Sequence, residues 1–163
     1  MTGATGRNVR VALVAAVAAS TVAVLGALLT DLGPWYYALR KPAWQPPDWL
    51  FGPAWTLIFG LTAVAGVIGW TYAPDRRTRR QMLALFAVNA ALNVLWSVLF
   101  FRMHRPDWAL AEVGFLWLSI VALMLVLRPV SKPASWLLLP YLLWVTFASA
   151  VNAAVVVLNA PFR

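Results

Sequence analysis

The chain has 163 residues, of which 63% are hydrophobic and 11% are charged, and its mean hydropathy is +0.77. This composition excludes an ordinary soluble domain and predicts an integral membrane protein, while the absence of cysteine and the single histidine exclude disulfides, thiolate nucleophiles and Cys/His metal sites. The net charge of +8 comes largely from arginines in short gaps between apolar runs, where positive charge signals membrane topology, so we expect no nucleic-acid partner.

Five apolar runs are separated by charged or proline-rich breaks, and a membrane-spanning helix needs about 20 mainly apolar residues. We therefore predict an all-α membrane protein, a bundle of five transmembrane helices that forms a single domain over residues 1–163. The predicted spans are residues 11–30, 50–72, 81–101, 108–127 and 134–158.

The first run, residues 11–30, follows a polar segment that carries Arg7 and Arg10. A cleaved signal peptide is the alternative interpretation, since small residues inside the run would suit a peptidase. The run continues well beyond the ~7–15 residues of a signal-peptide core, so we expect it to stay in the protein as a span. The sequence leaves open whether residues 1–18 are removed.

The loop between the first two runs leads into the stretch WYYALRKPAWQPPDWLFGPAW, residues 35–55, which contains four tryptophans, two tyrosines and four prolines. Pro42, Pro46 and Pro47 have no amide hydrogen and disfavour helix at the residue before them, so residues 40–48 cannot form a regular helix. A structured loop of this length is more often functional than connective, and we expect a stiff aromatic lid. The alternative is a membrane-interface belt, where tryptophan and tyrosine are enriched whatever the function.

Two amides of the third run, Asn89 and Asn93, lie one helical turn apart, with Trp96 on the same side. An amide in hydrocarbon is costly without a partner, so this side should face the bundle interior. Hydrogen bonding between helices and contact with a ligand would both satisfy the amides. On the opposite side, the four-residue spacing of Ala87 and Ala91 allows another helix to approach closely, either in a homodimer or within one subunit.

The fourth run follows a charged turn that holds the only histidine, His104, which we expect to be solvated. Asp107 is placed to cap the helix, and Glu112 is the only carboxylate well inside a span. We expect Glu112 to reach the membrane interface or the positive helix end. The alternative is a protonatable residue that couples transport to protons.

The fifth run contains Trp144, Ala148 and Asn152, which recur every four residues and therefore share one face of the predicted helix. Pro140 leaves a carbonyl free near the helix start. We expect the shared face to line a cavity.

Basic residues predict the orientation of the chain. With five spans, the N-terminus and the second and fourth connections lie on one side of the membrane, which holds eight basic residues against five on the other. Because cytoplasmic segments are enriched in arginine and lysine, we predict a cytoplasmic N-terminus. The aromatic loop and the C-terminus would then be extracytoplasmic.

The loop motif KPAWQPP, the stretch VNAALNVLWSVLFF of the third run and PYLLWVTFASAVN of the fifth together resemble the TspO/translocator protein family, the tryptophan-rich sensory proteins. The resemblance covers about residues 32–158. It implies a bundle of five helices, usually dimeric, with a cavity under the first loop that binds porphyrins and related tetrapyrroles, sterols or synthetic benzodiazepine-site ligands. By motif it implies ligand-binding roles for Tyr36, Trp44, Pro46, Trp55, Asn89, Trp96, Trp144 and Ala148. The sterol motif of the animal members needs a late tyrosine, which residues 152–163 lack, so sterol binding is in doubt.

The resulting hypothesis is a receptor or transporter-like membrane protein that binds tetrapyrroles of the porphyrin or haem type, with a sensory or regulatory role and no required cofactor. A porphyrin is a flat apolar plate with carboxylates at one edge, so Trp55, Trp96 and Trp144 would supply aromatic faces while Arg40 and Lys41 hold the carboxylates at the rim. Membrane lipid is the other expected partner. The alternatives are a light- and oxygen-dependent porphyrin-degrading enzyme, although no catalytic constellation is visible, and a proton-coupled small-molecule transporter.

Overall fold

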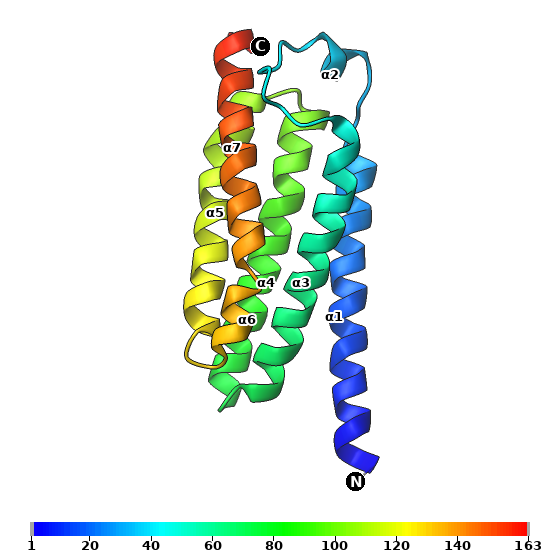
Figure 1. Cartoon of the computed structure of the whole chain (residues 1–163), viewed down its shortest axis with the longest axis vertical. Helices are drawn as coiled ribbons and strands as arrows, with labels where there is room; N and C mark the ends of the chain where they lie inside the picture. Colours follow the sequence, from blue (N-terminus) through cyan, green and yellow to red (C-terminus); the bar gives the residue numbers. More distant parts are fainter. Residues whose placement is uncertain (1, 163) are drawn as a thin grey trace.

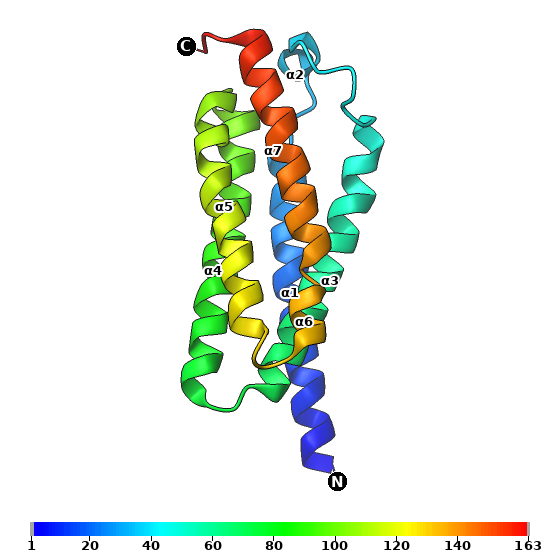
Figure 2. The same cartoon turned by 60° about the vertical axis from the view of Figure 1, so that its left-hand side comes forward.

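The computed structural model describes residues 2–162, which form five long helices packed side by side and two short ones (Figures 1 and 2). The long helices are α1 (Thr2–Leu29), α3 (Phe51–Tyr72), α4 (Arg76–Ser97), α5 (Pro106–Leu127) and α7 (Leu139–Asn159), and the short ones are α2 (Pro34–Ala38) and α6 (Lys132–Trp136). Each long helix, alone or with its flanking turns, contains a stretch long and apolar enough to cross a membrane. The predicted all-α bundle of five transmembrane helices is confirmed.

Consecutive long helices run in opposite directions, so the two ends of the chain lie at opposite ends of the bundle (Figure 1). The loop between α1 and α3, residues 30–50, covers one end, which we call the loop end. The opposite end carries the α3–α4 turn and α6, and we call it the arginine end because four arginines of residues 76–80 lie there. At this end α1 projects beyond the other helices (Figure 1).

Helix α5 is the central element of the packing. Its buried positions recur at helical spacing from Ala109 through Ile120 to Leu127, and it packs against both α4 and α7. Helix α1 lies at the periphery, because none of its described side chains is fully buried. Near the arginine end the Leu127 side chain of α5 reaches the backbone of α3, since a Cβ added at Gly69 would collide with its terminal methyl group.

Two of the long helices are interrupted where the sequence predicted continuous spans. The fifth span, predicted as residues 134–158, is divided into α6 and α7 by a turn at Leu137 and Leu138. Pro140 explains the division, since it has no amide hydrogen to donate and its ring clashes with the carbonyl four residues earlier, so it fits only in the first turn of α7. Helix α4 ends in a π-helical turn, Val98–Arg102.

The start of α5 differs from its prediction. Arg105 precedes the helix, Pro106 is in its first turn, and no side chain caps it. Asp107, predicted to cap, instead accepts a hydrogen bond from Arg105 Nε (2.8 Å) and forms an ion pair with the same guanidinium. The capping prediction was wrong because a charged donor two residues away is a stronger partner for a carboxylate than a backbone amide.

Candidate functional site

The loop over the loop end is held in shape by Tyr36, the one buried residue of α2. Its hydroxyl donates to Asp48 Oδ1 (2.7 Å) and accepts from Gln45 Nε2 (3.1 Å). Burial, followed by the hydrogen bond to Asp48, raises the pKa of the Tyr36 phenol well above its usual range, so the phenol remains a donor at physiological pH. These bonds join the two halves of a segment whose prolines prevent regular helix.

The Lys41 side chain packs against the aromatic rings of the same loop. Its ammonium is 3.5 Å from the centre of the Tyr36 ring and 5.0 Å from that of Tyr37, which is cation–π geometry. Desolvation lowers the pKa of Lys41, although the Asp48 carboxylate acts in the opposite direction. A basic group therefore lies at the inner surface of the loop, where only aromatic rings and one carboxylate compensate its charge.

The loop is fastened to the bundle by contacts with α7 and with the α4–α5 turn. The backbone amide of Arg40 donates to Asn159 Oδ1 (2.8 Å), and Asn159 Nδ2 donates to the Arg40 carbonyl (2.8 Å). The Trp35 ring stacks on His104, with ring centres 4.1 Å apart. His104, which we expected to be solvated, is exposed but in contact with the loop. The loop is therefore closed in this structure.

Beneath the loop is a small cavity of about 50 Å³. Its walls come from the loop, the start of α3, the end of α4 with its π-helical turn, and α7. The lining residues are Tyr36, Leu39, Lys41, Gln45, Phe51, Trp96, Phe100, Phe101, Ala148, Val151, Asn152 and Val155. Trp96 stacks on Phe100 with ring centres 5.0 Å apart, so one wall is an aromatic surface. Five residues named from the sequence meet in this lining: Tyr36, Lys41, Trp96, Ala148 and Asn152.

Below the cavity a polar cluster joins α4, α5 and α7. Tyr141 donates to Asn89 Oδ1 (3.2 Å) and accepts from Asn93 Nδ2 (3.1 Å), while Asn89 Nδ2 donates to Ser119 Oγ (2.8 Å). Trp55 approaches the Tyr141 ring edge-on, with centres 5.9 Å apart. In this closed structure the two amides therefore form hydrogen bonds between helices. Trp55 and Asn89 lie deeper than the cavity lining.

The other residues named from the sequence lie around the cavity rather than in its lining. Trp144 packs edge-on against Phe51, with ring centres 5.7 Å apart, and Phe51 lines the cavity. Pro46 is half-buried within the loop. Trp44 and Arg40 have exposed side chains, with Trp44 against Phe147 of α7. Ala87 and Ala91 are on the exposed outer face of α4.

Several residues of the site were not anticipated from the sequence. Asn159 is 119 positions from Arg40, and one asparagine at a helix end gives no signal of so distant a partner. Gln45 and Asp48 belong to the loop motif, but their bonds to Tyr36 depend on how the loop turns back. Asn152 lines the cavity as its helical face predicted, but its contact with the start of α5 was not anticipated. With the side-chain amide oriented to satisfy both of its ends, the nitrogen donates to the Pro106 carbonyl and the oxygen accepts from the Leu110 amide, both at 3.1 Å.

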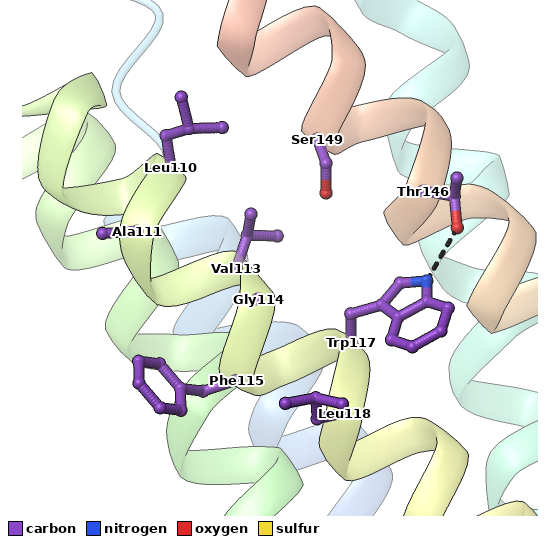
Figure 3. Close-up of a pocket in the computed structure, with 9 residues that line it drawn as sticks. All are labelled: Leu110, Ala111, Val113, Gly114, Phe115, Trp117, Leu118, Thr146 and Ser149. Carbon is purple, nitrogen blue, oxygen red and sulfur yellow. Dashed lines mark hydrogen bonds between the residues drawn. The ribbon is translucent and has the colours of Figure 1, made fainter.

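A second, larger hollow of about 590 Å³ opens between α5 and α7 on the outer face of the bundle (Figure 3). It is lined by Leu110, Ala111, Val113, Gly114, Phe115, Trp117, Leu118, Thr146 and Ser149. Trp117 of α5 donates from Nε1 to Thr146 Oγ1 of α7 (2.9 Å), which connects the two helices beside the hollow (Figure 3). None of the residues named as ligand-binding from the sequence lies in it, and its position within two spans exposes it to membrane lipid.

Comparison with known proteins places this architecture in a family. The profile of the TspO/MBR family matches residues 11–158, which include the loop and most or all of each of the five long helices. This chain belongs to the TspO/MBR family. A TspO/MBR protein with these five apolar helices is an integral, multi-pass membrane protein.

Relatives from bacteria and animals support the assignment. The chain is 46% identical over 128 residues to the tryptophan-rich protein TspO of Chlorobaculum tepidum, covering 77% of this chain and 80% of the relative. It is 37% identical over 137 residues to the tryptophan-rich sensory protein of Cereibacter sphaeroides, covering 84% of each chain. It is 30% identical over 122 residues to the translocator protein of Homo sapiens, covering 74% of this chain and 72% of the relative.

Proposed function

We propose that this TspO/MBR protein is a membrane receptor that binds flat apolar molecules, tetrapyrroles of the porphyrin or haem type among them, under its first loop. The observation that carries the proposal is the aromatic cavity at the loop end with Lys41 at its inner surface. Aromatic rings such as Trp96 and Phe100 suit a flat ring system, and a partly desolvated ammonium suits the carboxylates at its edge. The proposed function requires no cofactor in addition to the ligand.

The size of the cavity implies that the loop must move for a tetrapyrrole to bind. About 50 Å³ is far below the roughly 300–1,000 Å³ of typical ligand sites. The contacts between Arg40 and Asn159 and between Trp35 and His104 hold the loop closed, so they must open for entry. A ligand that binds only the open form shifts the loop between two states, and this shift is the physical basis we propose for a sensory or regulatory role.

Two alternatives stated from the sequence gain no support from the described residues. A light- and oxygen-dependent porphyrin-degrading enzyme would need catalytic groups beyond the indoles near the cavity, and the hydroxyl–carboxylate contact between Tyr36 and Asp48 joins two parts of the loop. A proton-coupled transporter would need a route to Glu112 from both ends of the bundle, whereas the core toward the arginine end is closely packed.

The deciding experiment is a titration of the purified full chain with protoporphyrin, followed by the quenching of tryptophan emission. We expect saturable binding at micromolar concentration, on the order of −8 kcal/mol. Trp144→Leu should weaken it by about 0.5–2 kcal/mol, that is about 2- to 30-fold, because ring stacking contributes about that much beyond burial. Replacing Arg40 and Lys41 by alanine should weaken binding more at low salt than at high salt, because charges at a rim are screened.

Two tryptophans serve as matched controls for the location of the ligand. Trp117 lies in the outer hollow of Figure 3, and Trp70 lies near the arginine end beside Arg79. Trp117→Phe and Trp70→Leu should leave the dissociation constant within about twofold of the parent. If Trp117→Phe weakens binding as much as Trp144→Leu, the porphyrin is in the outer hollow. Binding that never saturates is partitioning into the micelle, and either result refutes the proposed site.

We also infer that two copies of the chain pair through the outer face of α4. Ala84, Ala87 and Ala91 are exposed on this face, together with Val88 and Leu95, so a second helix can approach its backbone. Leucine at both 87 and 91 should reduce the dimer fraction in detergent, measured by cross-linking or light scattering. A variant that dimerises like the parent would place the interface elsewhere, and a variant that unfolds would assign the alanines to packing within one subunit.

The proposed orientation has a direct test. The arginine end carries Arg76, Arg77, Arg79 and Arg80 beside a single acid, Asp75, and we propose that this end is cytoplasmic. A reporter inserted near Arg77 should be cytoplasmic, and a reporter fused after the last residue should be extracytoplasmic. Exchanged locations would refute the charge argument and leave the five spans intact.

A further inference from the structure

One buried acidic group has no partner in the closed structure. Glu112 of α5 has only 7% of its surface exposed, and neither carboxylate oxygen has a hydrogen-bond partner among residues 2–162. The expectation that Glu112 would reach the membrane interface or the helix end is therefore not met. Buried polar groups in proteins are nearly always satisfied, so each exception needs an explanation.

The register of the helices locates Glu112. Helices α4 and α5 are antiparallel, and the hydrogen bond from Asn89 to Ser119 shows which residues lie opposite each other. Two helical turns toward the loop end lead from Asn89 to Trp96 on α4 and from Ser119 to Glu112 on α5. Residues two turns apart share a face, so Glu112, like Ser119, is directed toward α4 at the level of Trp96. Trp96 lines the cavity under the loop.

Two further unpaired groups lie at this level. The indole nitrogens of Trp96 and Trp144 are buried and have no acceptor among the described residues. Helices α4 and α7 run parallel, and the hydrogen bond between Asn93 and Tyr141 aligns them, so Trp96 and Trp144 lie at equal heights above it. The layer directly beneath the loop therefore contains two unused donors and one unused carboxyl group.

No cation of residues 2–162 is paired with Glu112. The nearest basic residues along α4 and α5 are at the ends of these helices, where Arg105 is paired with Asp107 and Arg102 donates to the Leu28 carbonyl. Arg105 lies seven positions before Glu112, which corresponds to a rise of about 10 Å along the helix. Lys41 lies against the Tyr36 ring in the loop. If Glu112 had only a structural role, we would expect its buried carboxyl group to be paired with one of these basic residues.

We propose that Glu112 is a binding residue for ligands, and that it selects flat aromatic molecules that carry a basic amine. An ammonium group on the ligand would form a charge-assisted hydrogen bond with the Glu112 carboxylate in a site shielded from water. The indole N–H groups of Trp96 and Trp144 would remain available to donate to an acceptor on the same ligand. Lys41 at the loop and Glu112 below it then give the cavity two poles of opposite charge. The inference rests on the proposed ligand cavity, and it adds a class of ligand opposite in charge to the carboxylates of a porphyrin.

The test compares two probes of nearly equal shape, 9-(aminomethyl)anthracene, whose amine is protonated at neutral pH, and 9-methylanthracene, which is an uncharged hydrocarbon. We expect the full chain in detergent to bind the amine about tenfold or more tightly than the hydrocarbon, after subtraction of partitioning into empty micelles. Glu112→Gln should reduce this preference below about twofold and leave the affinity for the hydrocarbon unchanged. Asp107→Asn is the matched control, because it removes a surface acid of the same helix and should retain the preference.

A second variant separates binding from a structural role. Glu112→Leu removes an unpaired buried carboxyl group, so it should unfold at the same temperature as the parent or higher and lose the preference for the amine. A lower unfolding temperature combined with a preference that Glu112→Gln retains would make Glu112 a structural residue and overturn the proposal. Equal affinity of the parent for both probes would also overturn it.

Protoporphyrin distinguishes this inference from the proposed function. If protoporphyrin binding saturates in the parent but the amine shows no preference, only the role of Glu112 fails. If protoporphyrin never saturates while the amine preference depends on Glu112, the tetrapyrrole proposal fails and the amine site stands. If neither probe class binds saturably, both are refuted.

Discussion

Toward the arginine end, Leu127, Ala134 and Leu138 have no exposed surface, and the only buried side-chain group without a partner among the described residues of that end is the Nε of Arg79. Toward the loop end, the interior contains a cavity, three unpaired buried groups at Trp96, Trp144 and Glu112, and a loop held by side-chain contacts. The two halves of the bundle therefore differ in how closely their interiors are packed. The half near the arginines is closely packed, whereas the half beneath the loop contains the site for which we propose a ligand, and such a division is expected where function competes with stability.

The largest expected effect is a cavity in the closely packed half. Leu127→Ala should lower the free energy of unfolding by about 2–4 kcal/mol, because packing contacts, rather than exclusion from water, hold helices together in a membrane. Thermal or detergent-induced unfolding measures the loss. Leu125→Ala is the control on the same helix, where the side chain is exposed to lipid, and it should be nearly neutral. Equal losses would mean that this half is not selectively packed.

The next effect concerns the polar cluster between the two halves. Tyr141→Phe removes the hydroxyl that joins Asn89 and Asn93, leaving an acceptor and a donor unsatisfied in a buried site. We expect a loss of about 1–3 kcal/mol in unfolding free energy. Tyr72→Phe, at an exposed position near the end of α3, should change stability little. A Tyr141→Phe variant as stable as the parent would show that other groups can satisfy the amides.

A smaller effect of opposite sign is expected beneath the loop. Ala148→Val adds two methyl groups at the cavity wall, so it should stabilise the closed protein by about 0.5–1 kcal/mol while weakening protoporphyrin binding. Unfolding and fluorescence titration of the same variant measure the two changes. If the variant loses stability, the cavity has no usable space at this wall, and the contrast between the halves is weaker than the structure implies.

The smallest effect is expected at the surface of the arginine end. The Asp75 side chain accepts from the Thr78 amide (2.7 Å) at the start of α4, and this bond lowers the pKa of Asp75. Because the folded-state pKa is depressed, the carboxylate stabilises the protein above its unfolded pKa, near 3.9, and this contribution is lost as the pH falls through the lower folded value. Asp75→Ala should therefore lower the unfolding temperature slightly at pH 7. The difference from the parent should disappear near pH 2, and a difference that persists there would have another cause.

Much of the fold follows from the sequence, because a run of about 20 apolar residues in lipid has no alternative to the helix. The prolines at 42, 46 and 47 likewise determine that the loop is not regular helix. Helical periodicity placed Asn89 and Asn93 on an inward face, and the structure shows both buried. Features that depend only on neighbouring residues of the chain, such as helix or loop and the buried face of a helix, could therefore be predicted from the sequence.

Partners across the bundle could not be predicted in this way. Periodicity gives the face of a helix that is buried, whereas the register between helices depends on the packing of all five at once. Three features therefore appear only in the tertiary structure: Tyr141 binds both amides, Asn159 binds the backbone of Arg40, and Glu112 has no partner among residues 2–162. The sequence determined which segments cross the membrane, because each residue in the hydrocarbon must be apolar or have its polar groups satisfied, whatever its neighbours in space. The tertiary structure decided which polar groups are satisfied, because a hydrogen bond requires two atoms to meet within about 3 Å.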